Sequence, residues 1–296
     1  MSLIAEFPRS SLFVGVRYSI AICISIANST DREIRSILRG MENHTTIKRE
    51  VVAHNDATDS GNPMHDDAAA RALNFKGALV PGITVFGYMT HSLIERFGVE
   101  WLDQGFMQVR FRRPVYAGET LTIETHDDDT GQAINIEVQN SDGELCVVGR
   151  GSMHSVSVSF PEAFAPLRKI PQPKWPATRS QFEREKVLGS LEATFLGAEA
   201  TEFLRAMQDD QSVYQTGTTH PAWLLRQANI VVDRNFDLGP WIHVESEIQN
   251  HARAKNDERI EVRAQVVDLY EKKGHEYFDL DVVMLADGDP NRLIMR

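Results

Sequence analysis

Hydrophobic residues in the segment before Gly98 recur at the spacing of a helix. They occupy every fourth position: Val85, Met89, Leu93 and Phe97. This spacing places them on one face of a buried or half-buried helix. Gly98 follows directly and suits a C-terminal cap, because glycine adopts the left-handed conformation easily. We therefore expect a long helix that ends at Gly98.

Beyond this helix the period of the hydrophobic positions changes to two. Alternation runs through three segments: Met107 to Phe111, Leu121 to Ile123 and Ile134 to Val138. This period predicts antiparallel strands, and the residues at 127–131 and 141–143 are of the types that hairpin turns require. A last strand is expected from about Leu145 to Val158. A helix followed by such strands predicts a curved antiparallel sheet wrapped around the helix.

An acidic segment rich in turn-forming residues precedes the helix and runs from His54 to Asp67. Asn62 and Pro63 suit a turn, and Asp66 suits the N-terminus of a short helix over DAAARAL. We expect this segment to lead into the long helix through the pair Pro81-Gly82.

The same order of elements returns in the second half of the chain. A proline-rich stretch over 160–176 reads as a linker, and helix-forming segments follow at 198–207 and 221–232. FMQVRFRRPVY from Phe106 resembles WIHVESEIQNH from Trp241, and the hairpins at Gly131 and Gly274 correspond. This pattern predicts an internal duplication; two unrelated α+β domains remain the alternative.

Composition and charge narrow the class of protein. A chain of 296 residues is long enough for two domains of ordinary size. Its composition, with 42% hydrophobic and 25% charged residues, is typical of a globular protein. The formal charge of -11 disfavours nucleic acid and anionic membrane surfaces as partners. Cys23 and Cys146 cannot form a disulfide framework, so we expect a reducing, cytoplasmic location.

The N-terminal region needs a separate interpretation. Residues 11–27 are apolar but contain Arg17, and they are too few to span a bilayer comfortably. A signal peptide is one reading, although no clear cleavage site follows. The other readings are a loosely attached extension, or sequence upstream of a natural start at Met41. We exclude residues 1–40 from the predicted fold.

Two segments together resemble the MaoC-like dehydratase family, which includes the (R)-specific enoyl-CoA hydratases. They are DSGNPMHDDAAARALNFKGALVPG from Asp59 and VRFRRPVYAGETLTI from Val109, within a likeness that covers Val51 to Val148. The resemblance implies the hot-dog fold, and duplicated members hold one catalytic and one degenerate copy. Here the second half has no N-P-x-H segment. We therefore expect an α+β chain of two fused hot-dog units, an intrachain pseudo-dimer that could pair further as a homodimer.

This expectation divides the chain into four regions. They are an N-terminal extension (1–44), a MaoC-like hot-dog domain that carries the site (45–160), a linker (161–180) and a degenerate hot-dog domain (181–296).

The resemblance also implies a reaction and its residues. In the family, an aspartate and a histidine hold a water beside the β-carbon of an enoyl-CoA, and a backbone N–H binds the thioester oxygen. His65 matches the histidine, Asn62 the asparagine that braces the loop, and Gly82 the N–H donor at the helix N-terminus. No metal or cofactor is implied, and His54, His91 and His126 lack partners at metal-ligand spacing.

The family aspartate is the one departure. Ser60 occupies the expected position, five residues before His65, and Asp59 lies one residue earlier. Rearrangement at Gly61 could bring Asp59 into place, since glycine tolerates unusual backbone angles; otherwise the site lacks its acid. We interpret Asp56, Asp66 and Asp67 as solvated or helix-capping residues.

Other residues are candidates for substrate contacts. Arg110 and Arg112 alternate to one face of the predicted strand and Arg113 to the other. The first two could pair with CoA phosphates, although an exposed strand face is the preferred explanation; Ser60 and Asn62 complete the predicted binding set. Tryptophans are interpreted as core or interface anchors: Trp101, Trp223 and Trp241. Trp223 could also line an acyl tunnel.

Three functions remain open from the sequence. The first is a hydro-lyase of fatty acid metabolism that acts on an acyl-CoA thioester, with His65 and Asp59 as the acid/base pair. The second is a hot-dog thioesterase. The third is a non-catalytic acyl-CoA binding protein, which Ser60 would favour, because fold alone does not determine function.

Overall fold

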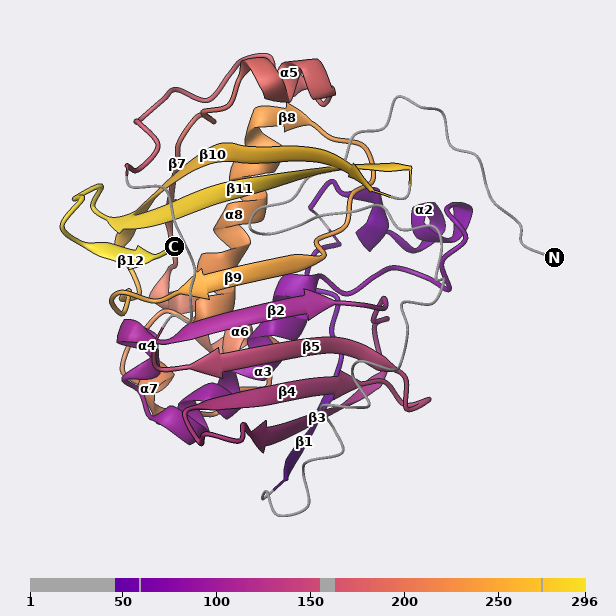
Figure 1. The fold of residues 1–296 in the computed structure, drawn as a ribbon, viewed down its shortest axis with the longest axis vertical. Coiled ribbons are helices and arrows are strands. Elements are labelled where there is room, and N and C mark those ends of the chain that lie inside the picture. Colours follow the sequence, from indigo (N-terminus) through magenta and orange to yellow (C-terminus); the bar gives the residue numbers. More distant parts are fainter. Residues whose placement is uncertain (1–45, 59, 155–162, 273) are drawn as a thin grey trace.

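The computed structural model describes residues 46–58, 60–154, 163–272 and 274–296. Its first half contains these elements: β1 (Ile47–Val52), the 3-10 turn η1 (Pro63–His65), α2 (Asp67–Ala72), α3 (Gly82–Phe97), α4 (Trp101–Gln104), β2 (Phe106–Phe111), β3 (Thr120–Asp127), β4 (Ala133–Gln139) and β5 (Leu145–Ser152). The strands pair antiparallel in the order β1-β3-β4-β5-β2. They lie across α3, as Figure 1 shows.

Alternation of side chains builds the core between this sheet and α3. Leu121, Ile123, Ile136 and Val138 are all buried, and they come from positions of β3 and β4 that alternate with partly exposed ones. They belong to the same buried cluster as Met89 of α3. The predicted helix and strands are therefore confirmed, and Gly98 ends α3 at φ 78°.

The predicted last strand is too long. β5 ends at Ser152, and Met153 and His154 form a bend. Residues 155–158, which the prediction included, lie outside the described residues. The alternation did not show where the strand ends, because Ser and Val continue it in the sequence.

The second half repeats the arrangement. It contains β6 (Trp175–Pro176), α5 (Arg179–Arg184), β7 (Leu191–Thr194), η2 (Gly197–Glu199), α6 (Ala200–Met207), α7 (Ser212–Gln215), α8 (Pro221–Asn235), β8 (Phe236–Asp237), β9 (Glu245–Gln249), β10 (Arg259–Lys272), β11 (His275–Ala286) and β12 (Leu293–Met295). Its sheet order is β7-β10-β11-β12, and a bridge between Asn250 and Met295 places the end of β9 beside β12. This order matches that of the first half element by element.

Strands β2 and β9 join the halves as two identical subunits would be joined in a symmetric dimer. They pair antiparallel, with Phe106 opposite Gln249 and Arg110 opposite Glu245. Gln108 lies opposite Glu247, the corresponding residue of the other half, and donates a side-chain hydrogen bond to it at 3.2 Å. A pseudo-twofold axis therefore passes between these two residues.

The same turn, closed by a hydrogen bond from a backbone N–H to a glutamate side chain, precedes both β3 and β10. Tyr116 N–H donates to Glu119 Oε2 at 2.9 Å, and Lys255 N–H donates to Glu258 Oε2 at 3.0 Å. The residue before each glutamate has a positive φ. It is Gly118 at 84° in the first half and Asp257 at 65° in the second. The predicted duplication is thus visible in the main chain.

The predicted alignment of the repeats was out of register. It matched Phe106 with Trp241, but β2 begins at Phe106 and β9 begins at Glu245. Because the error is an even number of residues, every side chain keeps its face of the sheet, and the alternation alone could not reveal it.

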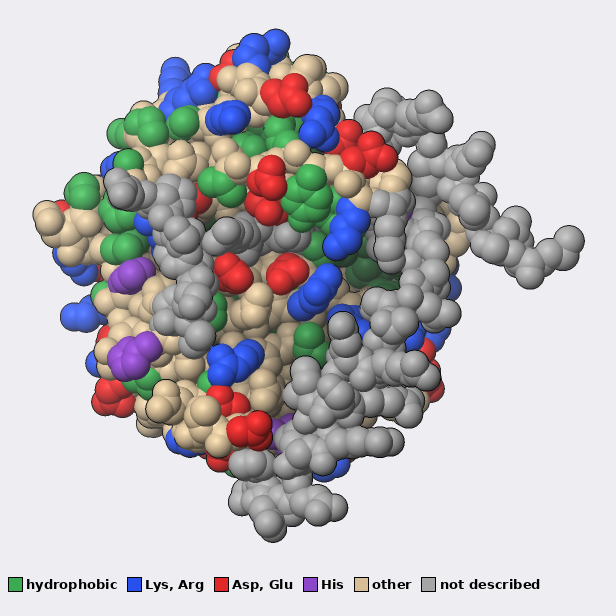
Figure 2. All heavy atoms as spheres, viewed as in Figure 1, with side chains coloured by type: hydrophobic (Ala, Val, Ile, Leu, Met, Phe, Trp, Pro, Cys, Tyr) green, Lys and Arg blue, Asp and Glu red, His purple; other side chains and the backbone are tan. Residues whose placement is uncertain are grey.

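Acidic and basic side chains are interspersed over the described part of the face shown in Figure 2. No helix among the described residues has the length and apolar character needed to cross a membrane.

Candidate active site

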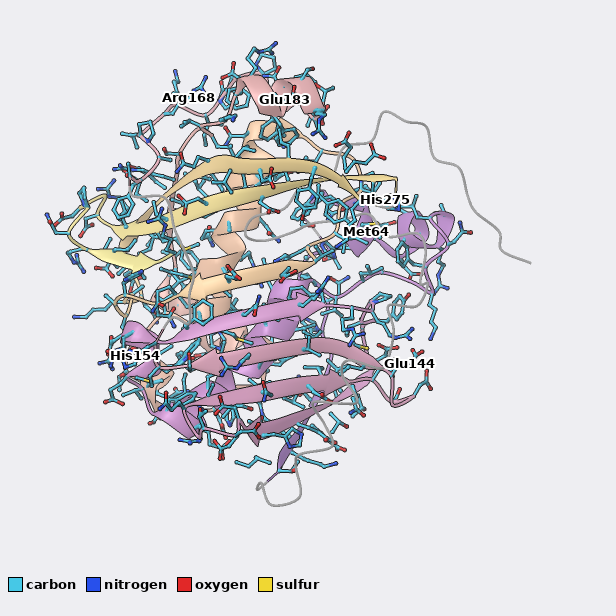
Figure 3. The ribbon with its side chains drawn as sticks, viewed as in Figure 1. Met64, Glu144, His154, Arg168, Glu183 and His275 are labelled. Atoms are coloured by element: carbon cyan, nitrogen blue, oxygen red, sulfur yellow. The ribbon has the colours of Figure 1, made fainter. Side chains whose placement is uncertain are left out.

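The N-P-M-H segment forms the turn η1, and its asparagine braces that turn. Asn62 Oδ1 accepts from Met64 N–H at 3.1 Å, which caps the turn, and Asn62 Nδ2 donates to the Trp241 carbonyl at 3.0 Å. Met64 is buried in a small cluster with Leu79 that includes the partly buried Ile242. The loop is therefore fixed against the second half of the chain. Figure 3 shows Met64 at the opposite end of the view from His154.

His65 is held in one tautomer by the backbone. Its Nδ1 lies 2.8 Å from the Leu79 carbonyl oxygen, which can only accept, so Nδ1 carries the proton. Burial lowers the pKa of His65; the Leu79 carbonyl and the charge of Asp56 oppose this shift. The neutral ring is therefore favoured, and its Nε2 is an acceptor of the kind that a general base requires.

Gly82 begins α3 close to this histidine in the fold, three residues after Leu79. As the first residue of a helix it has no intrahelical acceptor for its N–H, and no other hydrogen bond of the described residues uses this N–H. A Cβ on Gly82 would lie 3.1 Å from the Phe111 ring, so glycine permits a close approach. The helix dipole adds to the attraction for negative charge at this point.

Asp56 has contacts beside the start of α3 that the sequence interpretation did not predict. Its Oδ1 accepts from Thr84 Oγ1 at 2.5 Å, and its Oδ2 pairs with Arg226 of α8. The carboxylate is mostly buried, with 12% of the side chain exposed. The expectation that Asp56 is solvated or caps a helix is therefore wrong. A pattern of local spacing gives no signal for it, because its cationic partner comes from the other half.

The other acids behave as predicted, or are not described. Asp66 caps α2 by accepting from Ala69 N–H at 2.7 Å, and the exposed Asp67 pairs with Arg71. Asp59 lies outside the described residues. Ser60 is exposed, and its Oγ accepts from Asn62 N–H at 3.4 Å. The roles of Asp59 and Ser60 therefore stay predictions.

The loop before β9 in the second half contacts Phe111, whose ring lies beside Gly82 at the N-terminus of α3. Phe111 N–H donates to the Val244 carbonyl at 2.8 Å, and the rings of Phe111 and His243 lie 4.9 Å apart. Burial lowers the pKa of His243 to about 3. Both halves therefore build the surroundings of His65 and Gly82, although all the residues matched to the family motif lie in the first.

The second half lacks the corresponding chemistry. Its helix α8 begins with Pro221, where α3 has Gly82, and proline has no N–H. Trp223 stands where Thr84 stands in α3, and its ring lies 5.3 Å from the buried Phe195. The prediction of a degenerate half agrees with this geometry; the acyl tunnel at Trp223 stays a prediction.

The arginines after Val109 do not all lie on one strand. β2 ends at Phe111, and the N–H groups of Arg112 and Arg113 both donate to the Cys146 carbonyl. The predicted alternation of Arg112 and Arg113 is therefore wrong. Arg110 is exposed beside Glu245, with 3.8 Å between charged atoms. Binding of CoA phosphates by Arg110 and Arg112 stays a prediction.

A second group of titratable residues surrounds Asp209. His91 Nδ1 lies 3.2 Å from Asp209 Oδ1, and His220 Nε2 lies 3.4 Å from Asp209 Oδ2. Asp210 joins His91 and Asp209 in a group whose ligand atoms lie within 4.8 Å of one another, a spacing a metal ion could use. Ala222 N–H donates to His220 Nδ1, so the neutral His220 ring carries its proton on Nε2, which faces Asp209 Oδ2 without hydrogen-bond geometry.

Comparisons with known proteins agree with the fold. A family model described as MaoC like domain matches residues 34–145. A MaoC domain protein dehydratase from Chloroflexus aurantiacus J-10-fl has a TM-score of 0.59 at 12% identity, over 92% of this chain and 96% of its own. A conserved hypothetical protein from Mycobacterium tuberculosis, described as a double hotdog fold, has a TM-score of 0.54 at 12% identity, over 88% and 96%. No curated protein matches the sequence.

At these identities the solved structures show the fold, and the family model covers the segments of the first half that carry the motif. The prediction of two hot-dog units in one α+β chain is confirmed. Residues 34–145 thus match a MaoC-like domain, and the chain has a double hot-dog fold.

Proposed function

We propose that this protein is a hydro-lyase that adds water to a trans-2-enoyl thioester, or removes it from the 3-hydroxyacyl thioester. The observation that carries the proposal is the pairing of an acceptor and a donor at one helix N-terminus. His65 offers Nε2 because Leu79 holds Nδ1, and Gly82 offers an N–H without an intrahelical acceptor. The proposed substrate carrier is CoA, by resemblance to the family.

The chemistry requires both groups. Water attacks the β-carbon and its proton passes to His65 Nε2, while the π electrons move toward the thioester oxygen. The Gly82 N–H stabilises the resulting enolate charge, and a donor of this kind is worth roughly 3 to 4 kcal/mol. The imidazolium then returns the proton to the α-carbon on the same face. A C–O and a C–H bond form, one O–H bond breaks, and the protein ends unchanged.

Hydration of crotonyl-CoA by His65→Ala tests this assignment. We expect a loss of at least about a hundredfold in kcat/KM, because the water loses its base. His154→Ala is the matched control, since His154 is exposed at the far end of β5. Equal rates in the parent and in His65→Ala would remove the proposal. Release of free CoA without a hydrated product would indicate thioesterase chemistry, and saturable binding without any turnover would indicate a binding protein.

A further inference from the structure

Arg226 of the second half reaches across the junction into the first-half site. Its guanidinium pairs with Asp56 Oδ2 and lies over the Phe203 ring, 5.3 Å from the ring centre. Only 28% of its side chain is exposed. An arginine packed in this way is restricted in orientation, and its planar group fixes the carboxylate that it binds.

The other oxygen of Asp56 is held by the first half. Thr84 is fully buried in the first turn of α3, and its hydroxyl donates to Asp56 Oδ1 at 2.5 Å. The carboxylate therefore has one partner from each half of the chain. A carboxylate accepts about four hydrogen bonds, so these two partners leave capacity for a water molecule.

The charge of Asp56 also acts on the proposed base. It opposes the effect of burial on the pKa of His65. The Asn55 side chain, from the residue before Asp56, donates to the His65 carbonyl at 3.0 Å. The segment that carries Asp56 and the turn that carries His65 are thus tied together beside the start of α3.

The two halves differ at the position of Arg226. Counted from the first residue of each helix, Arg226 of α8 corresponds to Gly87 of α3. The first-half site therefore receives an arginine from the second half, while Gly87, at the corresponding position, has no side chain to offer in return. The first residues of the two helices, Gly82 and Pro221, differ in the same sense, because only the first half has the N–H donor.

We propose that Asp56 supplies the carboxylate of the active site, and that Arg226 is a positioning residue that the degenerate half contributes to hold it. The inference rests on the proposed function. Asp56 accepts one hydrogen of the attacking water, and His65 Nε2 accepts the other and takes the proton. Arg226 and Asp56 exchange no proton. Asp56 then replaces the family aspartate, whose expected position is occupied by Ser60.

Kinetics of the full-length protein with crotonyl-CoA test the role of Arg226. Arg226→Gln is expected to lower kcat by about tenfold to a hundredfold with little change in KM, because the carboxylate loses its orientation. Arg226→Lys should recover part of the loss, since it keeps the charge without the planar fork. Arg234→Gln is the matched control, because Arg234 is exposed on the same helix.

Non-additivity separates positioning from general stabilisation. If Arg226 acts through Asp56, the double variant Asp56→Asn/Arg226→Gln should have the kcat of Asp56→Asn within about twofold. Losses that multiply, or an unchanged kcat in Arg226→Gln, would overturn the inference. Circular dichroism and thermal melting of each variant show whether a loss reflects unfolding.

Titration of His65 by NMR provides a readout that does not need turnover. Asp56→Asn should lower the pKa of His65, because the opposing charge is removed, whereas Asp129→Asn at an exposed position should leave it unchanged. An unchanged His65 pKa in Asp56→Asn would contradict the inference by itself. If the parent converts no enoyl thioester but this pKa falls, the proposed function fails and the pairing of Asp56 with His65 stands.

Discussion

The helix α3 begins with Gly82 and the helix α8 begins with Pro221, at the same position of the two repeats. The residues before them, Pro81 and His220, have nearly the same backbone angles, φ -56° and ψ 136° against φ -69° and ψ 136°. The main chain is therefore shared, and the difference lies in the side chains and in one N–H group. Duplication has preserved the scaffold of both sites and the hydrogen-bonding chemistry of only the first.

The second half has not become irrelevant to the first. It provides Arg226 to Asp56, the Trp241 carbonyl to Asn62, and His243 to the ring of Phe111. In a symmetric dimer each subunit must carry the site and its supports on one sequence. A fused chain can separate these tasks, which is what the contrast between the halves shows.

The largest expected effect comes from giving α3 the first residue of α8. Gly82→Pro removes the proposed donor to the thioester oxygen, and kcat for crotonyl-CoA should fall by about a hundredfold to a thousandfold. The extended angles of Pro81 are compatible with a following proline, so the helix should still form. Steady-state kinetics measure the loss.

Gly82→Ala separates the lost N–H from steric crowding. It keeps the donor but places a Cβ 3.1 Å from the Phe111 ring. The proline variant should be much the slower of the two. Equal losses in both variants would mean that space at Phe111, rather than the donor, explains the effect.

A smaller effect is expected in the pH dependence of stability. The folded protein holds the pKa of His243 at about 3, below the unfolded value near 6.5, because the ring is buried. The unfolded state therefore binds more protons as the pH falls below 6.5, and stability decreases toward acid pH. From pH 7 to pH 5 this residue accounts for about 2 kcal/mol of that decrease.

His243→Gln introduces the residue that the first half has at the same position, Gln104, two residues before its strand. Urea unfolding at the two pH values should show a smaller decrease in the variant by about 2 kcal/mol. His154→Gln, at an exposed position, is the control. An identical decrease in the parent and in His243→Gln would contradict the assignment.

The smallest effect is expected from the reverse exchange in the second half. Pro221→Gly restores an N–H at the start of α8, yet it should produce no hydratase activity in the His65→Ala background, because Trp223 stands in place of Thr84. Stability should fall by up to about 1 kcal/mol, since glycine is more flexible in the unfolded chain. Activity that appears in this double variant would show that the second half still holds a working site.

The sequence could predict what depends on local pattern. Helical spacing predicted α3 and its end at Gly98, and turn-forming residues predicted the hairpins at Gly131 and Gly143, which both have positive φ. The N-P-x-H motif directed attention to His65, whose interaction with Leu79 then followed from the fold.

Contacts between the halves could not be predicted in this way. Asp56 and Arg226 lie 170 residues apart in the sequence, one in each half, and neither lies in a motif with fixed spacing. The start of β9 was equally hidden, since a shift by an even number of residues preserves the alternation. Arg112 lies beyond the end of β2, and its N–H donates to the Cys146 carbonyl. The residue types in this segment do not indicate where the strand ends.

Titration of the protein with butyryl-CoA, followed by the NMR signal of His65, tests the central claim most directly. Butyryl-CoA has the carrier and thioester of the proposed substrate but no double bond to hydrate, and His65→Ala identifies the signal by its loss. The account predicts that the His65 signal shifts and saturates at one equivalent per chain. A signal that does not move while butyryl-CoA binds, or one that needs two equivalents to saturate, would contradict a single thioester site beside His65 and Gly82.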